Sequence, residues 1–290
     1  MNPVSIGATI SASFRFVGVA WTRAWGILLL WVWLAAIVQA IQLARPELTP
    51  LTWLIDILAI FVSTAAIGAF YRVGVESDHP GDSAYAVGPS GFNWGNLEWR
   101  VLLANIVVAV IIGVLLFFAI LIWAVVFGVS AAASGATAQG LEAAPGSAAQ
   151  MAAFYHLMLG PAGVVSVIIA IPFLIGLLFL GAKLALFAVT VADTGKLAFG
   201  EAWALTKGAL GPLIVTTVVV FLAQTAVVQA VAFIAGVLAG ALGQGPQGGL
   251  WGGVAGQIVA VSINGPLVAG MQIYVYRAKR GDAGVAQTFA

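Results

Sequence analysis

Long runs without a charged residue constrain this chain more than any other feature. Residues 24–44, 101–141, 143–182 and 208–276 contain no Lys, Arg, Asp or Glu. One helical span of a membrane needs about 20 residues, so each run can hold a span, and the last holds two that are separated at the glycine-rich residues 243–249. Backbone groups in hydrocarbon must be satisfied within the structure, and runs of this length without polar alternation predict helices and not a barrel.

The composition agrees with a membrane protein. The chain has 290 residues, of which 62% are hydrophobic and 7% charged, whereas soluble domains carry about 25% charged residues. Such a chain cannot bury its apolar surface in one water-soluble core. We therefore predict an all-α polytopic membrane protein, a single membrane domain over residues 1–290. Its six transmembrane helices are expected at residues 25–43, 49–71, 101–129, 162–183, 213–242 and 250–276.

The distribution of basic residues predicts the orientation. Six spans put both termini on one side, and of the 11 Lys and Arg residues only Arg45 falls on the opposite side. By the positive-inside rule, the side that carries the others faces the cytoplasm. We expect a multi-pass protein of a bacterial cytoplasmic (inner) membrane, with both termini in the cytoplasm.

Similar short segments precede three pairs of spans, and we name them lead-in segments. Each has a large apolar residue followed by glycine, in Ile6-Gly7, Trp94-Gly95 and Phe199-Gly200. Similar short sequences rich in small and β-branched residues recur later in each pair, at residues 36–41, 124–129 and 226–231. Several matches in one order indicate an internal repeat.

The second span of each pair ends in a similar way. The spacing of Pro172, Gly176 and Lys183 is the same as that of Pro266, Gly270 and Arg277. In the first pair, Phe61 takes the position of the proline and Arg72 the position of the basic residue. We predict three parallel two-helix hairpin repeats, at residues 4–72, 92–184 and 197–277, related by an axis along the membrane normal. The glycines at 176 and 270 should let neighbouring helices approach closely.

The lead-in segments are expected to form amphipathic interfacial helices. In the first, residues 4–23, an apolar stripe with helical spacing is flanked by Arg15 and Arg23; the stripe comprises Ile6, Ile10, Phe14, Val17 and Trp21. A further interfacial helix on the far side is predicted at residues 147–159, after a flexible segment at 131–146.

Amide side chains are the polar groups that remain deep in the predicted spans, because no ionisable residue lies there. They are Gln39, Asn105, Gln224, Gln229, Gln257 and Asn264. Buried amides most often hydrogen-bond across helices and so hold them together. The alternative is that Gln39, Gln229 and Asn264 line a ligand-binding path among the hairpins. Asp56 likewise allows two interpretations, an acid that reaches headgroup water or a proton- or ion-binding group.

Catalytic and metal sites are not indicated. No arrangement of serine and histidine residues resembles a hydrolase site, and no pair of carboxylates is placed for general acid–base catalysis. His79 with Asp78 and Asp82 is more typical of solvated loop charge than of a metal site. The chain has no cysteine, a net charge of +1 and no cofactor motif, so we predict no metal, no cofactor and no nucleic-acid partner.

Two lead-in sequences carry a resemblance to a known family. Gly95-Asn96-Leu97-Glu98-Trp99-Arg100 and the segment from Phe199 to Gly208, FGEAWALTKG, are similar to those of bacterial six-helix proteins that resemble the membrane domain of glycerophosphodiester phosphodiesterases. In that family the hydrolytic chemistry belongs to a separate soluble barrel domain, which has no counterpart in this sequence. The resemblance implies a stand-alone membrane module without catalysis.

These features favour a non-enzymatic integral membrane protein that acts as a scaffold or accessory subunit of a membrane assembly. Its expected partners are membrane lipids and a protein partner or further copies of itself. The alternative is a transporter or channel for a lipid-like or small neutral solute, in which Pro172 and Pro266 open the helix backbone. An enzyme would require a catalytic constellation that the sequence does not contain.

Overall fold

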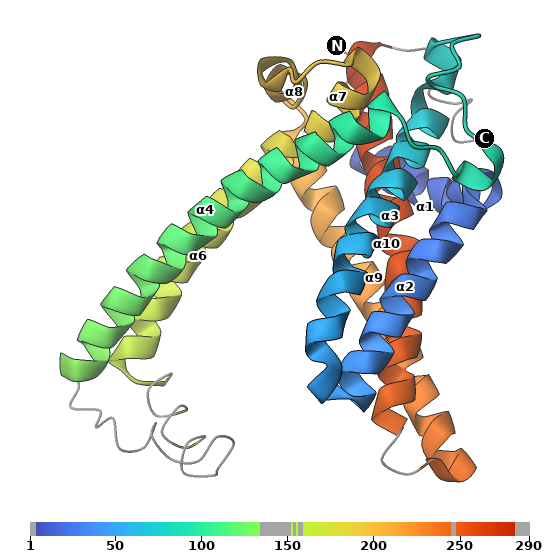
Figure 1. Ribbon diagram of the computed structural model, residues 1–290. Coiled ribbons are helices and arrows are strands. Elements are labelled where there is room, and N and C mark those ends of the chain that lie inside the picture. The colour runs from blue at the N-terminus through green and yellow to red at the C-terminus, as the bar shows by residue number, and fades with distance from the viewer. Residues whose placement is uncertain (1–3, 134–151, 153–154, 156–158, 245–247, 282–290) are drawn as a thin grey trace. The chain divides into compact units, whose positions relative to one another are not determined.

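The computed structural model describes residues 4–133, 152, 155, 159–244 and 248–281. Every regular element in this described part is a helix, and six helices are long and apolar enough to cross a membrane. They are α2 (Trp25–Ala44), α3 (Thr49–Val75), α4 (Asn96–Ala133), α6 (Pro161–Leu184), α9 (Leu210–Ala239) and α10 (Gly248–Arg280) (Figure 1). Each predicted span coincides with one of them, so the six-helix prediction is confirmed. The predicted interfacial helix at 147–159 falls mostly outside the described residues.

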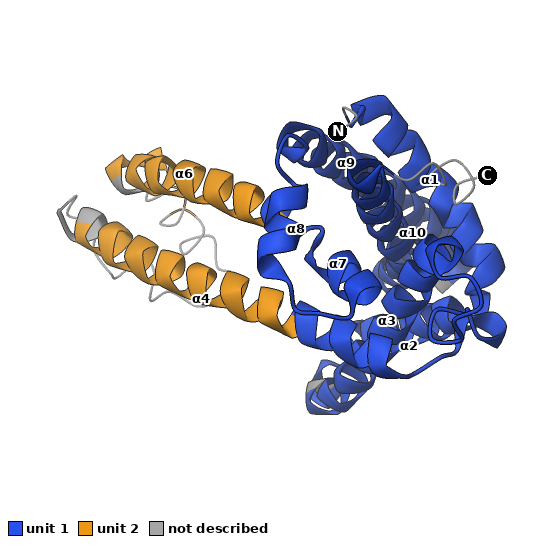
Figure 2. Ribbon diagram, turned by 90° about the horizontal axis from the view of Figure 1, so that it is seen from above, with its two compact units in different colours: residues 1–105, 182–290 blue, residues 106–181 orange. Residues whose placement is uncertain are grey.

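The chain forms two compact units (Figure 2). Unit 1 comprises residues 1–105 and 182–290, and unit 2 comprises residues 106–181. Unit 2 is therefore a hairpin made from most of α4 and most of α6. The remaining spanning helices belong to unit 1, together with α1 (Ile6–Arg23), α7 (Phe187–Thr194) and α8 (Phe199–Leu205).

Helix α10 is the centre of unit 1, where it packs against α1, α2, α3 and α9 (Figure 1). Its side chains from Pro266 onward are mostly buried, and Leu267, Ile273 and Tyr276 are completely so. Pro266 lies inside this helix, as Pro172 lies inside α6. The apolar core of unit 1 thus follows the second half of α10.

Small residues bring α9 and α10 into backbone contact. A Cβ atom on Gly252 would lie 2.6 Å from the carbonyl oxygen of Ala232, and one on Gly256 would lie 3.2 Å from the Ala232 Cβ. A Cβ on Gly236 would lie 3.3 Å from the Gly248 carbonyl oxygen. Glycines at 248, 252 and 256 repeat every four residues and so share one face of α10. Larger side chains on this face would force the helices apart.

The first lead-in segment forms a helix, α1, but the face that it buries is not the predicted stripe. Its buried residues are Thr9, Ala12, Ser13, Phe16 and Ala20, whereas Ile6 and Phe14 are exposed. The hydroxyls of Thr9 and Ser13 donate to backbone carbonyls one turn earlier, at 2.7 and 2.8 Å, so this small polar face can be buried without unsatisfied groups. The remaining stripe residues, Ile10, Val17 and Trp21, are half-buried at the edge of this face.

Gly270 allows α1 to approach α10, as the sequence predicts. A Cβ at this position would lie 2.6 Å from the Phe16 Cβ and 3.2 Å from the Ser13 Cα. The Phe16 ring also packs edge-on against Phe70 of α3, with 6.2 Å between ring centroids. The matching expectation for Gly176 is not met inside unit 2, because a Cβ there would meet no described atom within 4 Å.

Two helix boundaries lie near the third lead-in segment. The apolar residues after Lys183 form the separate helix α7, in which residues 187–193 are all buried. The break before α9 occurs at Gly208, where φ is +74°, and Gly211 and Pro212 lie in the first turn of α9. Proline is accepted there because the first turn needs no amide donor from it.

Candidate functional site

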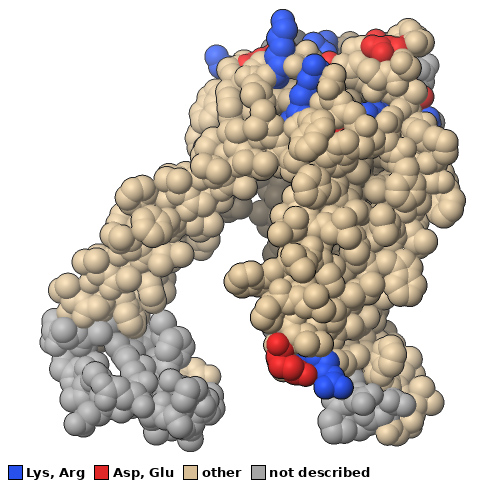
Figure 3. Space-filling model, viewed as in Figure 1, with Lys and Arg blue, Asp and Glu red and all other residues tan. Residues whose placement is uncertain are grey.

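Lys and Arg side chains gather at one end of unit 1, which we name the basic end (Figure 3). It contains the C-terminal ends of α3 and α10, the start of α4, and α7 and α8. Arg45 lies instead in the connection between α2 and α3, at the opposite ends of those helices, where it pairs with Glu47. Six charged residues at the basic end are buried: Arg72, Glu98, Lys183, Asp193, Arg277 and Lys279.

Asp193 is the centre of the largest polar cluster. It occupies the last turn of the buried helix α7, which ends at Gly195 with φ of +69°. Its carboxylate accepts a 2.5 Å hydrogen bond from the Tyr276 hydroxyl. Arg280 also donates to this carboxylate. Three percent of the Asp193 side chain is exposed, so its charge is balanced almost entirely by protein groups.

The loop between α3 and α4, residues 76–95, reaches the same aspartate. His79 Nε2 lies 2.8 Å from Asp193 Oδ1. The Tyr85 hydroxyl donates to the Asp193 backbone carbonyl at 2.8 Å, and the Tyr85 ring stacks on His79 with 3.8 Å between centroids and 9° between planes. Burial, followed by the nearby charges of Asp193 and Asp82, raises the pKa of Tyr85 against an opposing effect of Arg100. Tyr85 is therefore a neutral hydrogen-bond donor at physiological pH.

A second buried cluster joins α3 to the start of α4. Arg72 and Glu98 form a two-pronged ion pair in which the Arg72 Nη2 to Glu98 Oε2 distance is 2.8 Å. Glu98 Oε2 also accepts the Gly95 backbone N–H at 2.8 Å, which caps the first turn of α4. Arg72 Nε donates to the Ala84 carbonyl at 3.0 Å. This pair fixes the second lead-in segment and its loop at the same time.

Arg277 of α10 binds the beginning of the same loop. Its Nη1 donates to the Gly74 carbonyl at 2.9 Å, and its Nη2 donates to Ser77 Oγ at 3.0 Å and to Asp78 Oδ1 at 2.7 Å. His79 and Asp78 are partly exposed, as the sequence interpretation of solvated loop charge expects, but each also has a partner within the protein. The two side chains point to different partners, His79 to α7 and Asp78 to α10.

The clusters are suited to fixing backbone segments and not to proton transfer with a substrate. Each carboxylate described above is already hydrogen-bonded to cationic or hydroxyl donors within the chain. Buried charges of this kind are tolerated when paired and hydrogen-bonded. Among the described residues, no group of three or more His, Cys, Asp or Glu side chains could hold a metal ion.

The amides singled out as ligand candidates lie elsewhere in unit 1. Gln39 of α2 is half-buried, and its Nε2 lies 3.5 Å from the position of a Cβ on Gly253 of α10. Gln229 of α9 and Asn264 of α10 are both exposed, as is Asp56 of α3. The structure thus puts Gln39 between α2 and α10 and leaves the other two amides on the surface of their helices. Their role in ligand binding stays a prediction.

Sequence reasoning missed the importance of Asp193 and Glu98. Their partners come from widely separated positions, such as His79 and Tyr276, and no local motif joins them. The available signal was that each acid borders an apolar segment, Asp193 after residues 184–192 and Glu98 before residues 101–141. An acid at such a border is costly unless a buried partner meets it.

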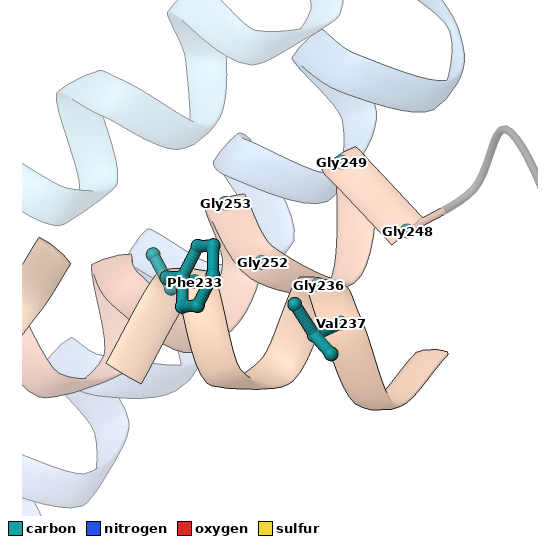
Figure 4. A pocket seen from close by; sticks show the side chains of 8 residues that line it. Phe233, Gly236, Val237, Gly248, Gly249, Gly252 and Gly253 are labelled. Atoms are coloured by element: carbon teal, nitrogen blue, oxygen red, sulfur yellow. The ribbon is translucent and has the colours of Figure 1, made fainter. Parts of the chain in front are cut away.

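Apolar depressions lie on the described parts of the spanning helices, and two of them are relevant to ligand binding. The first, of about 390 Å³, runs between α9 and α10. Figure 4 shows Phe233 and Val237 beside a floor made of glycines of α10. The second, of about 220 Å³, lies between α4 and α6 inside unit 2, and its lining includes Trp123 and Phe173.

Comparison of this chain with protein-family models, with curated proteins and with solved structures gives no match.

Proposed function

We propose that this chain is a non-enzymatic integral membrane protein that acts as a scaffold or accessory subunit of a membrane assembly. The observation that carries the proposal is the open surface of the α4–α6 hairpin. The most apolar stretches of α4 and α6 have 0% and 11% of their residues buried. Within unit 2, the two helices therefore leave most of their apolar surface uncovered by each other, and this surface can contact lipid or a membrane partner.

The chemistry of the hairpin limits what can cover it. Residues 106–133 and 159–181 have no Lys, Arg, Asp or Glu, and their exposed side chains include Phe117, Ile120 and Ile168. Such a surface associates through van der Waals packing with lipid chains or with another membrane helix, whether of a protein partner or of a second copy.

The test is extraction in native lipid discs followed by mass spectrometry of what remains bound. The double variant Phe117→Ala with Ile168→Ala should lose a protein partner that the wild type retains. A matched control is Trp53→Ala with Leu54→Ala, because these α3 residues are equally apolar and exposed. A wild-type protein that is extracted alone, and whose deletion leaves every membrane complex intact, contradicts the proposal.

We also propose the three-hairpin repeat, at residues 4–72, 92–184 and 197–277. It is supported by equivalent contacts at the basic end. Arg72 pairs with Glu98, and Lys183 Nζ lies 4.9 Å from the centroid of the Trp203 ring. Glu98 and Trp203 each stand three residues after the lead-in glycine, Gly95 or Gly200. In both cases the basic residue at the end of one hairpin, Arg72 or Lys183, contacts the residue three positions after the glycine of the next lead-in segment.

The alternative function is transport or channelling of a lipid-like or small neutral solute. The apolar depression inside unit 2 favours it, because the depression is lined by hydrocarbon and aromatic groups that fit an acyl chain. The same alternative assigns Gln39, Gln229 and Asn264, which all belong to unit 1, as polar contacts of the solute. Gln39→Leu with Gln229→Leu should abolish flux in reconstituted vesicles. Unchanged flux, or none in the wild type, contradicts this alternative.

The proposed location is a bacterial inner membrane, with the basic end and both termini in the cytoplasm. The gathering of Lys and Arg at one end of unit 1 supports this orientation (Figure 3). The resemblance to the membrane domain of glycerophosphodiester phosphodiesterases belongs to the same proposal, since it agrees with a membrane module that has no catalytic site of its own.

A further inference from the structure

We propose that Arg100 and Lys196 form a binding site for the phosphate group of an anionic phospholipid, whose acyl chains lie along the apolar side chains beside the pair. Arg100 comes from the beginning of α4, and Lys196 from the connection between α7 and α8. This inference is independent of the accessory role proposed above. It requires only that the basic end lies at a membrane surface.

The fold brings the two basic residues together from distant parts of the chain. A Cβ atom on Gly195 would lie 2.5 Å from Arg100 Nη1 and 3.2 Å from Arg100 Cζ, so the guanidinium lies directly against the glycine that ends α7. Lys196 is the next residue, and consecutive Cα atoms are about 3.8 Å apart. Both basic residues belong to unit 1, so their proximity is a property of one compact body.

Hydrogen bonds fix the backbone that carries the pair. Thr194 Oγ1 accepts the Lys196 N–H at 3.3 Å, and the Ala198 N–H donates to the Lys196 carbonyl at 2.9 Å. Arg100 stands two residues after Glu98, whose carboxylate is held in the buried ion pair described above. A site on fixed backbone loses little conformational freedom when a ligand binds.

The positive charges of the pair are not neutralised by the described part of the chain. Both side chains are exposed, and neither forms an ion pair with a described Asp or Glu residue. Nearby acids have other partners: Glu201 pairs with Arg280, and Asp82 accepts the Ala84 N–H at 2.9 Å. The C-terminus of α7 contributes about half of one negative charge. The pair therefore retains a net positive charge that attracts an anion.

The two side chains fit the chemistry of a phosphate ester. A guanidinium presents parallel N–H donors that match two oxygens of a phosphate, and an ammonium adds a compact positive charge. Basic groups at the surface of a membrane attract anionic lipids, and each raises the affinity about fivefold.

Exposed apolar side chains beside the pair identify a lipid as the source of the phosphate. Trp99 precedes Arg100 and Leu197 follows Lys196, and both apolar side chains are exposed. Leu103, one turn further along α4, is exposed as well. Tryptophan is typical of the level of the lipid headgroups, with the acyl chains beyond it. A soluble phosphate has no contact to make with this surface, whereas a phospholipid places its chains on it.

The test is native mass spectrometry of the full chain in mild detergent, titrated with phosphatidylglycerol or with phosphatidylcholine of the same acyl chains. The wild type should bind phosphatidylglycerol more tightly. Arg100→Gln with Lys196→Gln should weaken the binding of phosphatidylglycerol about 25-fold, or about fivefold for each charge removed, and leave the binding of phosphatidylcholine unchanged. The charge-preserving variant Arg100→Lys with Lys196→Arg should keep most of the preference.

Arg15→Gln with Lys207→Gln is the matched control. Both residues are exposed and form no ion pair with a described residue, so the control removes the same charge from unit 1. It should change the affinity for phosphatidylglycerol by less than about fivefold. A loss as large as that of the Arg100 and Lys196 variant would show attraction by overall charge and overturn the site.

Glycerol 1-phosphate separates the lipid from a soluble phosphate. This compound has the charged head without acyl chains, so at equal concentration it should not displace phosphatidylglycerol from the wild type. Displacement would mean that the pair binds a soluble phosphate, and the lipid assignment would be wrong. Equal affinity of the wild type and the double glutamine variant for phosphatidylglycerol would also overturn the proposal.

The single change Lys196→Gln decides the matter if the double variant fails to fold. The Lys196 side chain is exposed, so its replacement leaves the packing of unit 1 intact. We expect the affinity for phosphatidylglycerol to fall about fivefold in this variant. An unchanged affinity refutes the site.

Discussion

Arg72, in the last turn of α3, and Glu98, in the first turn of α4, form a buried ion pair that connects two consecutive spanning helices of the chain. Their side chains are 3% and 0% exposed. A buried pair of this kind is costly to break from one side, since the remaining charge loses its partner while still removed from water. The pair therefore makes the connection between the two helices an integral part of the core of unit 1.

Removing one charge of the pair should destabilise the protein strongly. We expect Glu98→Gln to lower the free energy of unfolding by about 3 to 5 kcal/mol, because Arg72 would keep its charge with only neutral acceptors. The double change Arg72→Met with Glu98→Leu should cost less than Glu98→Gln alone, since no unpaired charge remains. Reversible unfolding in mixed detergent micelles, followed by tryptophan fluorescence, measures both.

The exposed pair at the other end of the helices is the matched control. Arg45 and Glu47 lie 3.4 Å apart, and their side chains are more than half exposed. Glu47→Gln should change the free energy of unfolding by no more than about 1 kcal/mol, because water replaces the lost partner. Equal effects of Glu47→Gln and Glu98→Gln would show that the Arg72–Glu98 pair has no special place in the core.

Adding one methyl group at Gly252 should separate α9 from α10. A Cβ there would lie 2.6 Å from the backbone oxygen of Ala232, and a backbone atom cannot move aside as the end of a side chain can. We expect Gly252→Ala to destabilise by about 1 to 3 kcal/mol, in spite of the higher helix propensity of alanine. The same unfolding assay measures the change.

Gly240→Ala is the control for the previous change. A Cβ at Gly240 meets no described atom within 4 Å, and the residue has right-handed helical φ and ψ. This substitution should be neutral or stabilise by up to about 1 kcal/mol. Destabilisation by Gly240→Ala as large as that by Gly252→Ala would refute the close packing at Gly252.

The six helices could be predicted from the sequence because each obeys a local rule. Spans such as α2 and α6 follow from the length of uncharged runs, and membrane spans satisfy their own backbone groups. The faces of the helices were harder to predict. For α1 the apolar stripe suggested a packing face, yet the buried face contains Thr9 and Ser13, whose hydroxyls bond to their own helix. In a membrane protein the surface is as apolar as the core, so hydrophobic periodicity does not identify the inside.

The candidate site was largely invisible to sequence reasoning for a different reason. Asp193 receives Tyr276, Arg280 and His79 through contacts that span 83 to 114 positions of the chain. No spacing rule relates those positions, and only the fold brings them together. Gly270 was predicted correctly as a close-approach position because a glycine at a helix contact is a local signal, whereas Gly176 carries the same signal without a described contact inside unit 2.

A comparison of two phenylalanines on α1 tests which face of that helix packs inward. Phe16 is completely buried against Phe70 and Gly270, whereas Phe14 is 46% exposed. We expect Phe16→Ala to cost about 3 to 5 kcal/mol of unfolding free energy and Phe14→Ala less than about 1 kcal/mol. The reverse order would mean that the stripe predicted from the sequence is the packing face after all.

Cysteine labelling in intact cells tests the proposed orientation of the basic end. Because the chain has no cysteine of its own, one introduced thiol reports one position without a background signal. Ser83→Cys and Leu197→Cys, both exposed at the basic end, should react with a membrane-impermeant maleimide only after the cells are opened. Glu47→Cys, in the connection between α2 and α3, should react in intact cells, because Arg45 and its neighbours lie at the opposite ends of these helices and the positive-inside rule directs the basic end to the cytoplasm. The labels are expected to divide in this way in every expression host in which the protein reaches the membrane. Labelling of Ser83→Cys in intact cells, with Glu47→Cys protected, would reverse the proposed topology while leaving the six-helix architecture unchanged.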